Sequence, residues 1–276
     1  MTDTAVVAAV PIKPAATVML VRDTVGHDGI EVFMLRRTLQ AAFAGGMYVF
    51  PGGRLDEVDG GAAMEEMCDG LTDARASELL QIEHGGLAYW VAAIRECFEE
   101  AGVLLARSAI GGDEVRFDEP AIEDRFNTAR HAVHDGKLDL LELCSTEGLR
   151  LMTDSIHYTA HWITPLGESR RFDTRFFVAR APAAQEPLHD DSETIASLWV
   201  RPADALERER VGELLMLPPT IACLRFLESH ATADAALAAA ATIGVPPRIL
   251  PKVRFAEPGG RIEVVLPGEP GYDEMS

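Results

Sequence analysis

Residues 95–103 read RECFEEAGV, and this stretch decides the fold because it sets acidic side chains against an apolar stripe on one predicted helix. At 3.6 residues per turn, the apolar positions around it fall within one arc of the helix. They are Val91, Ile94, Phe98, Ala101 and Leu105. Such a stripe is typical of a helix that packs on a sheet, so the pattern predicts a helix over residues 86–107 with this face inward.

The three glutamates of the stretch fall in a separate arc that points away from this core. Glu96, Glu99 and Glu100 are i, i+3 and i+4 neighbours, so their like charges weaken an isolated helix. Arg95 reaches Glu99 at i+4, but one guanidinium does not balance three carboxylates. Mg²⁺ or Mn²⁺, which prefer oxygen ligands, would relieve the repulsion. The alternative is a solvated acidic helix face in an acidic chain.

Length and composition indicate a soluble globular protein. The 276 residues fit one elaborated domain or one domain with a small appendage. Hydrophobic residues make up 47% and charged residues 25%, which is too apolar for a disordered chain. A net charge of -19 opposes general binding to nucleic acids. A small anionic ligand held through metal ions or an arginine cluster remains compatible with this charge.

The cysteines and the N-terminal residues bear on the compartment. The cysteines form no CxxC pair, so neither a disulfide framework nor a zinc site is indicated. They are Cys68, Cys97, Cys144 and Cys223. The apolar run at 5–12 is too short to span a membrane and lacks the basic lead-in of a signal peptide. We therefore expect no targeting segment, no membrane partner and a cytoplasmic location.

Periodicity and turn residues predict a mixed arrangement of strands and helices. Strands are expected at 15–23, 30–37, 47–53, 156–165, 174–182 and from 197. Helices are expected at 60–84, 86–107, 118–143 and within 217–242. The tail from Val245 is rich in Pro and Gly and predicts extended segments. Because strands and helices alternate irregularly, the pattern favours an α/β fold with a mixed sheet and helices on its faces.

Two separated segments together resemble the signature of the Nudix hydrolase family. In FPGGRLDEVD at 50–59, Gly53 matches the first position, and Asp59 stands where the family usually has glutamate. RECFEEAGV matches the arginine, glutamate, glycine and aliphatic positions of the second half. The family's box has only a few residues between these halves, whereas 35 residues separate Asp59 from Arg95 here. We interpret residues 60–84 as a helical insertion that leaves the glycine loop and the glutamate helix free to adjoin.

The resemblance covers most of residues 14–273. Over this range, the chain is similar to the branch of the family that contains a peroxisomal coenzyme A diphosphatase with an interrupted box. Its segments are PAATVMLVRD, EVFMLRR, HWITP, RRFDTRFFVA and LPGEPGY. It implies a Nudix-type α/β/α sandwich with a mixed sheet, a helical insertion in the box and a C-terminal extension. The implied hydrolase domain spans 14–230, with residues 231–276 forming a C-terminal helix and an extended tail packed on it.

A coenzyme A motif of the family is matched in part. Gly46, the FPGG at 50–53 and Arg37 fit it, whereas Ala42 stands at the second arginine and Leu35 replaces a threonine. The resemblance therefore implies metal-dependent hydrolysis of a diphosphate bond in a nucleoside diphosphate linked to another moiety, with coenzyme A or acyl-CoA favoured. NADH, ADP-ribose and dinucleoside polyphosphates are alternative substrates, and a non-catalytic nucleotide-binding module is an alternative function. The expected partner is a small nucleotide-type molecule, and the expected assembly is a monomer or homodimer.

The resemblance also implies a ligand set for Mg²⁺ or Mn²⁺. The implied metal ligands are Glu96, Glu99, Glu100 and the backbone carbonyl of Gly53. Such ions neutralise phosphate oxygens and lower the pKa of bound water. The implied catalytic residues are Glu99, Glu100, Arg95 and Glu193, with Arg95 orienting the carboxylates.

The general base and the phosphate contacts leave alternatives open. Glu193, in the loop HDDSET at 189–194, is the candidate base, and the alternative is a solvated acidic turn. Arg37, Arg171 and Arg175 are candidate substrate contacts because guanidinium groups suit phosphate oxygens. The two later arginines equally suit strand ends, where they would pair with acidic residues.

Overall fold

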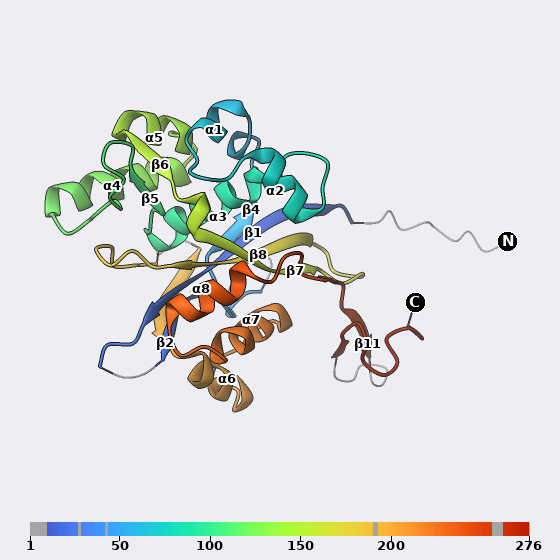
Figure 1. The fold of residues 1–276 in the computed structure, drawn as a ribbon. Helices are drawn as coiled ribbons and strands as arrows, with labels where there is room; N and C mark the ends of the chain where they lie inside the picture. Colours follow the sequence, from blue (N-terminus) through green and yellow to red (C-terminus); the bar gives the residue numbers. More distant parts are fainter. Residues whose placement is uncertain (1–9, 27–28, 42–43, 190–192, 256–261, 276) are drawn as a thin grey trace.

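A mixed sheet with helices on both faces forms the centre of the computed structural model, which describes residues 10–26, 29–41, 44–189, 193–255 and 262–275 (Figure 1). Its strands are β1 (Ile12–Asp23), β2 (Ile30–Arg37), β3 (Tyr48–Val49), β4 (Gly52–Arg54), β7 (Ile156–Ile163), β8 (Arg171–Arg180), β9 (Thr194–Val200) and β10 (Arg248–Ile249). They follow the order β10-β7-β8-β1-β2-β3, with β4 also beside β1 and β9 also beside β2. β1 runs parallel to β8 and antiparallel to β2 and β4.

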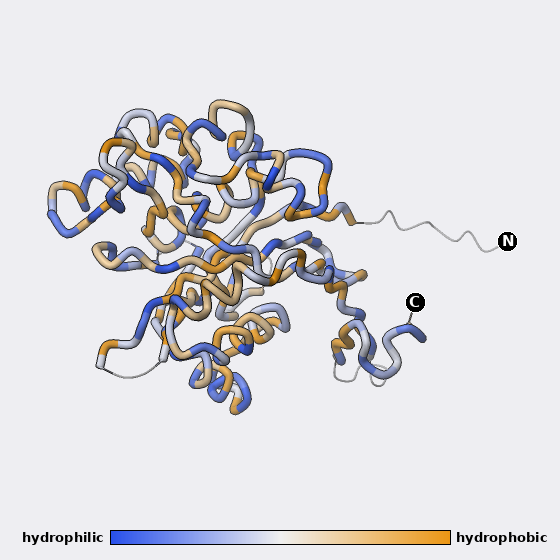
Figure 2. The backbone as a smooth tube through the Cα atoms, in the orientation of Figure 1, coloured by the Kyte–Doolittle hydropathy of each residue, from blue (hydrophilic) through white to orange (hydrophobic). Residues whose placement is uncertain are grey.

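The side chains of β1 alternate between two cores because successive residues of a strand point to opposite faces. Val18 and Leu20 lie in the core on one face, and Met19 and Val21 lie in the core on the other. Figure 2 shows hydrophobic segments gathered along these central strands. Burial on both faces explains why this strand reads as a nearly continuous apolar run.

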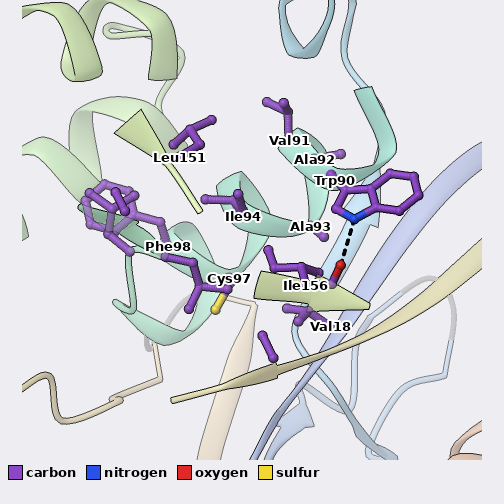
Figure 3. Close-up of a cluster of buried hydrophobic side chains, with 14 of the residues drawn as sticks. Val18, Trp90, Val91, Ala92, Ala93, Ile94, Cys97, Phe98, Leu151 and Ile156 are labelled. Atoms are coloured by element: carbon purple, nitrogen blue, oxygen red, sulfur yellow. Dashed lines mark hydrogen bonds between the residues drawn. The ribbon is translucent and has the colours of Figure 1, made fainter. Parts of the chain in front are cut away.

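The helices of the first half cover the face to which Val18 and Leu20 point, and they lie together above the sheet in Figure 1. They are α1 (Ala62–Glu66), α2 (Asp73–Leu80), α3 (Leu87–Ala101), α4 (Pro120–His134) and α5 (Leu140–Glu147). The apolar stripe of α3 packs on the sheet, and the indole N–H of Trp90 donates to the backbone oxygen of Ile156 at 3.0 Å (Figure 3). This bond satisfies the polar atom of an otherwise buried ring.

The opposite face is covered by helices from the second half of the chain. They are α6 (Pro202–Arg210), α7 (Pro218–Glu228) and α8 (Ala233–Ala241). Ala205, Leu224 and Ala236 are buried there against the sheet. The remaining elements are β5 (Ala106–Ser108) paired with β6 (Leu149–Leu151), β11 (Lys252–Phe255) paired with β12 (Ile262–Val265), and the 3₁₀ turns η1 (Glu57–Asp59) and η2 (Thr153–Ser155).

The predicted α/β/α sandwich with a mixed sheet is confirmed, but the helix predicted at 86–107 is too long. The helix ends at Ala101 because Gly102 adopts a left-handed conformation with φ +69, and its N–H donates to the oxygen of Phe98. The chain then turns through 103–105 into β5.

The other helical predictions contain breaks. Segment 60–84 holds two short helices, α1 and α2, and segment 118–143 holds α4 and the start of α5. In the tail, β10 adds a strand to the sheet edge, while the domain boundary at 230 stays a prediction. Within the described ranges, every helix is too short or too polar to cross a membrane. The run at 5–12 lies mostly outside the described residues.

Candidate active site

The glycine loop and the glutamate helix adjoin despite the insertion, as predicted. The N–H of Gly52 in β4 donates to Oε2 of Glu100 in α3 at 2.9 Å. A Cβ atom at Gly53 would lie 2.4–2.6 Å from the carboxylate atoms of Glu96, so any side chain there would have to displace that carboxylate. Glycine at position 53 therefore lets the backbone approach the carboxylate directly.

Arg95 joins the segments on both sides of the insertion through its buried guanidinium. Its Nε and Nη2 donate to the two oxygens of Asp59 at 2.7 and 3.0 Å, and Nη2 also donates to the oxygen of Arg54 at 2.8 Å. Its Nη1 donates to Oε1 of Glu96 at 3.0 Å and to Oε1 of Glu99 at 2.9 Å. One side chain thus fixes the orientation of three carboxylates.

Asp59, whose role the altered box spacing left open, is the bidentate partner of Arg95 and is fully buried. Its Oδ2 also accepts the N–H of Asp56 at 2.7 Å, which closes the turn η1. Burial raises the pKa of Asp59, and the hydrogen bond with Arg95 opposes that rise. The side chain of Asp59 is shorter than the glutamate that the family usually has here, but it still reaches Arg95.

The glutamates of α3 are crowded and poorly solvated. Burial raises the pKa of Glu96 to about 7, and Glu99 adds repulsion that Arg95 offsets in part. Burial followed by repulsion from Glu96 places the pKa of Glu100 well above its ordinary range. Within the described residues, no three histidine, cysteine or carboxylate groups are arranged to hold a metal ion. The carboxylates are bonded to Arg95 and Gly52 instead, but their type, crowding and contact with Gly53 fit a divalent cation.

Arg37 and Glu193 lie at the edge of this carboxylate cluster. Nη1 of Arg37, at the end of β2, is 3.9 Å from Oε1 of Glu100, and Nη2 is 3.7 Å from Oε2 of Glu193. The N–H of Thr38 donates to the backbone oxygen of Glu193 at 3.0 Å, which ties this loop to the end of β2. The structure therefore brings both predicted residues to the glutamates. Residues 190–192 of the predicted loop, and Ala42, lie outside the described residues.

Arg171 and Arg175 are buried residues of β8, and their contacts are with other parts of the protein rather than with the glutamates of α3. Nε of Arg171 donates to the oxygens of Thr164 and Pro165, each at 3.1 Å. Arg175 contacts Asp173 and His161, and its guanidinium lies 5.3 Å from the ring centre of Tyr89. Arg171 begins β8 but bonds backbone oxygens, whereas Arg175 pairs with an acidic residue but lies inside the strand. Each therefore meets only one part of the strand-end alternative, and the substrate role of both arginines stays a prediction.

Sequence reasoning missed two residues of α4 that reach the site. Arg130 donates from Nε to the oxygen of Glu99 at 2.8 Å and from Nη2 to the oxygen of Glu100 at 2.9 Å, capping the end of α3. Nδ1 of His134 lies 3.6 Å from Oε2 of Glu99. The only sequence signal is their i, i+4 spacing, which places both on one helix face without indicating what that face contacts.

Comparisons with known proteins bear on the family to which this chain belongs. The family model described as the NUDT19 Nudix domain matches residues 73–227. The crystal structure of a Nudix hydrolase from Alicyclobacillus acidocaldarius is 30% identical with a TM-score of 0.69, and the match covers 86% of this chain and 99% of that one.

Curated relatives include proteins named acyl-coenzyme A diphosphatase NUDT19. The one from Gallus gallus is 27% identical over 70% of this chain and 60% of its own length. The one from Homo sapiens is 27% identical over 74% of this chain and 62% of its own length. This chain thus spans about three fifths of the curated relatives that it matches. The chain belongs to the Nudix hydrolase family, in the branch defined by the NUDT19 Nudix domain.

Proposed function

We propose that this protein hydrolyses a diphosphate bond, in a metal-dependent reaction, in a nucleoside diphosphate linked to another moiety. The observation that carries the proposal is the contact of Arg95 with Asp59 on one side of the insertion and with Glu96 and Glu99 on the other. A solvated acidic helix face would not need a buried arginine to hold its carboxylates in place. The arrangement instead supports an assembled diphosphatase site.

The chain's own residues would bind and orient the reacting groups. Glu96, Glu99, Glu100 and the carbonyl of Gly53 would hold Mg²⁺ or Mn²⁺. Such an ion, when bound, neutralises phosphate oxygens and activates water for attack on phosphorus. Arg95 would keep the carboxylates in a fixed plane, because a guanidinium fork restrains two oxygens at once.

Glu193 would accept a proton from the attacking water. Its carboxylate is 52% exposed and lies 3.7 Å from Arg37, so it reaches solvent while remaining next to the cluster. Arg37, which lies between Glu193 and Glu100, would contact a phosphate oxygen of the substrate. Water then adds across the P–O–P bridge, and two phosphate monoesters leave.

Coenzyme A or an acyl-CoA is the favoured substrate. Curated relatives are named acyl-coenzyme A diphosphatases, and Gly46, Arg37 and the FPGG segment match part of a coenzyme A motif. NADH, ADP-ribose and dinucleoside polyphosphates are the next candidates, because the box binds the diphosphate and leaves the attached groups to other loops.

A substrate panel tests the proposal. The protein is incubated with coenzyme A, its acyl esters, NADH, ADP-ribose and dinucleoside polyphosphates, with Mg²⁺ or Mn²⁺, and products are identified by mass. We expect coenzyme A to yield 3′,5′-adenosine bisphosphate and 4′-phosphopantetheine, and chelation of the metal to stop the reaction. A folded protein that cleaves no diphosphate with either ion would instead be a nucleotide-binding module.

A further inference from the structure

A cavity of about 410 Å³ opens beside Glu99, and we call it the α4–α5 pocket. Asp56 and Val58 of the η1 segment line one side, and the turn that joins α4 to α5 lines the other. Arg95 and Glu99 of α3 form the part of the wall that belongs to the candidate active site. Pockets for small molecules commonly measure about 300–1,000 Å³.

The wall formed by α4 is held in place before any ligand binds. Arg130 is buried and bonds the backbone oxygens of Glu99 and Glu100. His134, one turn further along the same helix face, therefore stays within 3.6 Å of Glu99. In the turn that follows, the N–H of Gly136 donates to the oxygen of Val133 at 2.9 Å. The positive φ of Gly136, +67, turns the chain back so that the N–H of Lys137 donates to the oxygen of Ala132 at 2.8 Å.

The lining combines apolar side chains with an excess of acidic over basic ones. The apolar members are Val58, Val133, Leu138 and Leu140, and the carboxylates are Asp56, Glu99, Asp139 and Glu142. The three basic side chains of the lining already have partners. Lys137 pairs with Asp135 at 2.7 Å, and Nδ1 of His134 lies 3.6 Å from Glu99. Every nitrogen of Arg95 is bonded within the site. An additional phosphate group would meet uncompensated negative charge here. A neutral chain with methylene groups and amide N–H donors would match both parts of the lining.

We propose that the α4–α5 pocket binds the neutral, amide-bearing pantetheine arm of coenzyme A, and that the phosphorylated nucleoside half lies outside it. This inference rests on the proposed function, because it places one half of the substrate relative to the diphosphate site. An arm that enters from Glu99 continues directly from the diphosphate into the pocket. The carboxylates accept its amide N–H groups, and the apolar side chains cover its methyl and methylene groups.

Two half-substrates used as inhibitors test the placement. Val58 is 52% exposed at the pocket wall, and Val58→Trp fills that space without disturbing the core. Ile110→Trp is the matched control, since Ile110 is 90% exposed and lies outside the pocket. In coenzyme A turnover, we expect Val58→Trp to weaken inhibition by pantetheine severalfold and to leave inhibition by 3′,5′-adenosine bisphosphate as in the wild type. Ile110→Trp should change neither. If Val58→Trp instead weakened only the inhibition by 3′,5′-adenosine bisphosphate, the proposal would be overturned.

A binding measurement separates failure of this inference from failure of the proposed function. Ligand-observed NMR with pantetheine alone needs neither metal nor turnover, and Leu138→Ser provides a second variant that removes apolar surface from the wall. Weaker pantetheine binding in Val58→Trp and Leu138→Ser supports the pocket even if coenzyme A is not hydrolysed. Pantetheine binding that equals the wild type in both folded variants overturns the pocket assignment even if hydrolysis is robust.

Discussion

Arg95 gives the site its rigidity, because its three nitrogens together bond residues on both sides of the insertion. Nε holds Asp59, Nη1 holds Glu96 and Glu99, and Nη2 holds Asp59 again together with the oxygen of Arg54. A chain with 35 residues between the two halves of its box needs such a residue, since no short loop restrains one half against the other.

Replacing Arg95 with lysine keeps the charge but removes the planar fork. We expect Arg95→Lys to fold, with stability lower by about 1–3 kcal/mol because hydrogen bonds of buried Asp59 are lost. Turnover should fall by about 10- to 100-fold, the usual effect of disturbing groups that orient metal ligands. Urea unfolding and steady-state kinetics measure the two effects. Turnover equal to the wild type would mean that the arginine does not organise the carboxylates.

The metal-free protein should lose stability as pH rises, in part through Glu96. The folded pKa of about 7 lies above the ordinary 4.5, so the folded state binds the Glu96 proton more tightly than the unfolded state does. Its contribution is therefore fully present below pH of about 4.5 and is lost as pH rises through about 7. We expect Glu96→Gln to flatten the decline in melting temperature between pH 5 and pH 8 with chelator present. Parallel curves for the two proteins would show that Glu96 titrates normally.

Among the elements, the insertion is attached to the body of the protein in part through Arg150 of β6. Arg150 pairs with Asp69 and donates to the oxygens of Glu66 and Cys68, each at 2.6 Å. The N–H of Leu151 donates to the oxygen of Met67 at 2.7 Å. The insertion thus rests on a support of its own, apart from the contacts of Arg95.

Removing the side chain of Arg150 should make the insertion more mobile and leave the rate of hydrolysis nearly unchanged. We expect Arg150→Ala to speed amide hydrogen exchange in residues 62–70, because the carbonyls that it holds lose their donor. Turnover should stay within about threefold of the wild type, a change of less than 1 kcal/mol in the barrier. Arg75→Ala is the control, since the side chain of Arg75 pairs with Glu78 on the exposed surface of α2. A large loss of turnover in Arg150→Ala alone would mean that the insertion shapes the catalytic residues.

The sequence predicted the elements with a strong apolar pattern, but it did not predict where α3 ends or which residues of α4 contact it. The strand β7 and the apolar stripe of α3 follow from hydrophobic periodicity, which depends only on near neighbours. The end of α3 at Ala101 depends on the left-handed Gly102, which Arg130 also contacts closely. The roles of Arg130 and His134 depend on how α4 packs against α3, and no local pattern encodes that packing.

At the scale of the whole molecule, the net charge of -19 makes binding of a multiply charged diphosphate unfavourable without a cation. The candidate cation ligands lie on α3 beside the glycine loop of β4, and further carboxylates line the adjacent pocket. Metal ions and local arginines such as Arg37 would therefore supply the positive charge that the surface lacks.

The central claim is that the two halves of the interrupted box form one metal-dependent active site, and Glu99→Gln with added Mn²⁺ tests it most directly. The amide keeps the size of the side chain and removes the charge that repels Glu96, so the metal-free variant should melt at or above the wild-type temperature. Added Mn²⁺ should raise the melting temperature of the wild type, because an ion that binds only the folded state stabilises it, and should raise that of Glu99→Gln much less. Diphosphate turnover should be lost in the variant. A wild type that gains nothing from Mn²⁺, together with a variant that hydrolyses coenzyme A at the wild-type rate, would contradict the account.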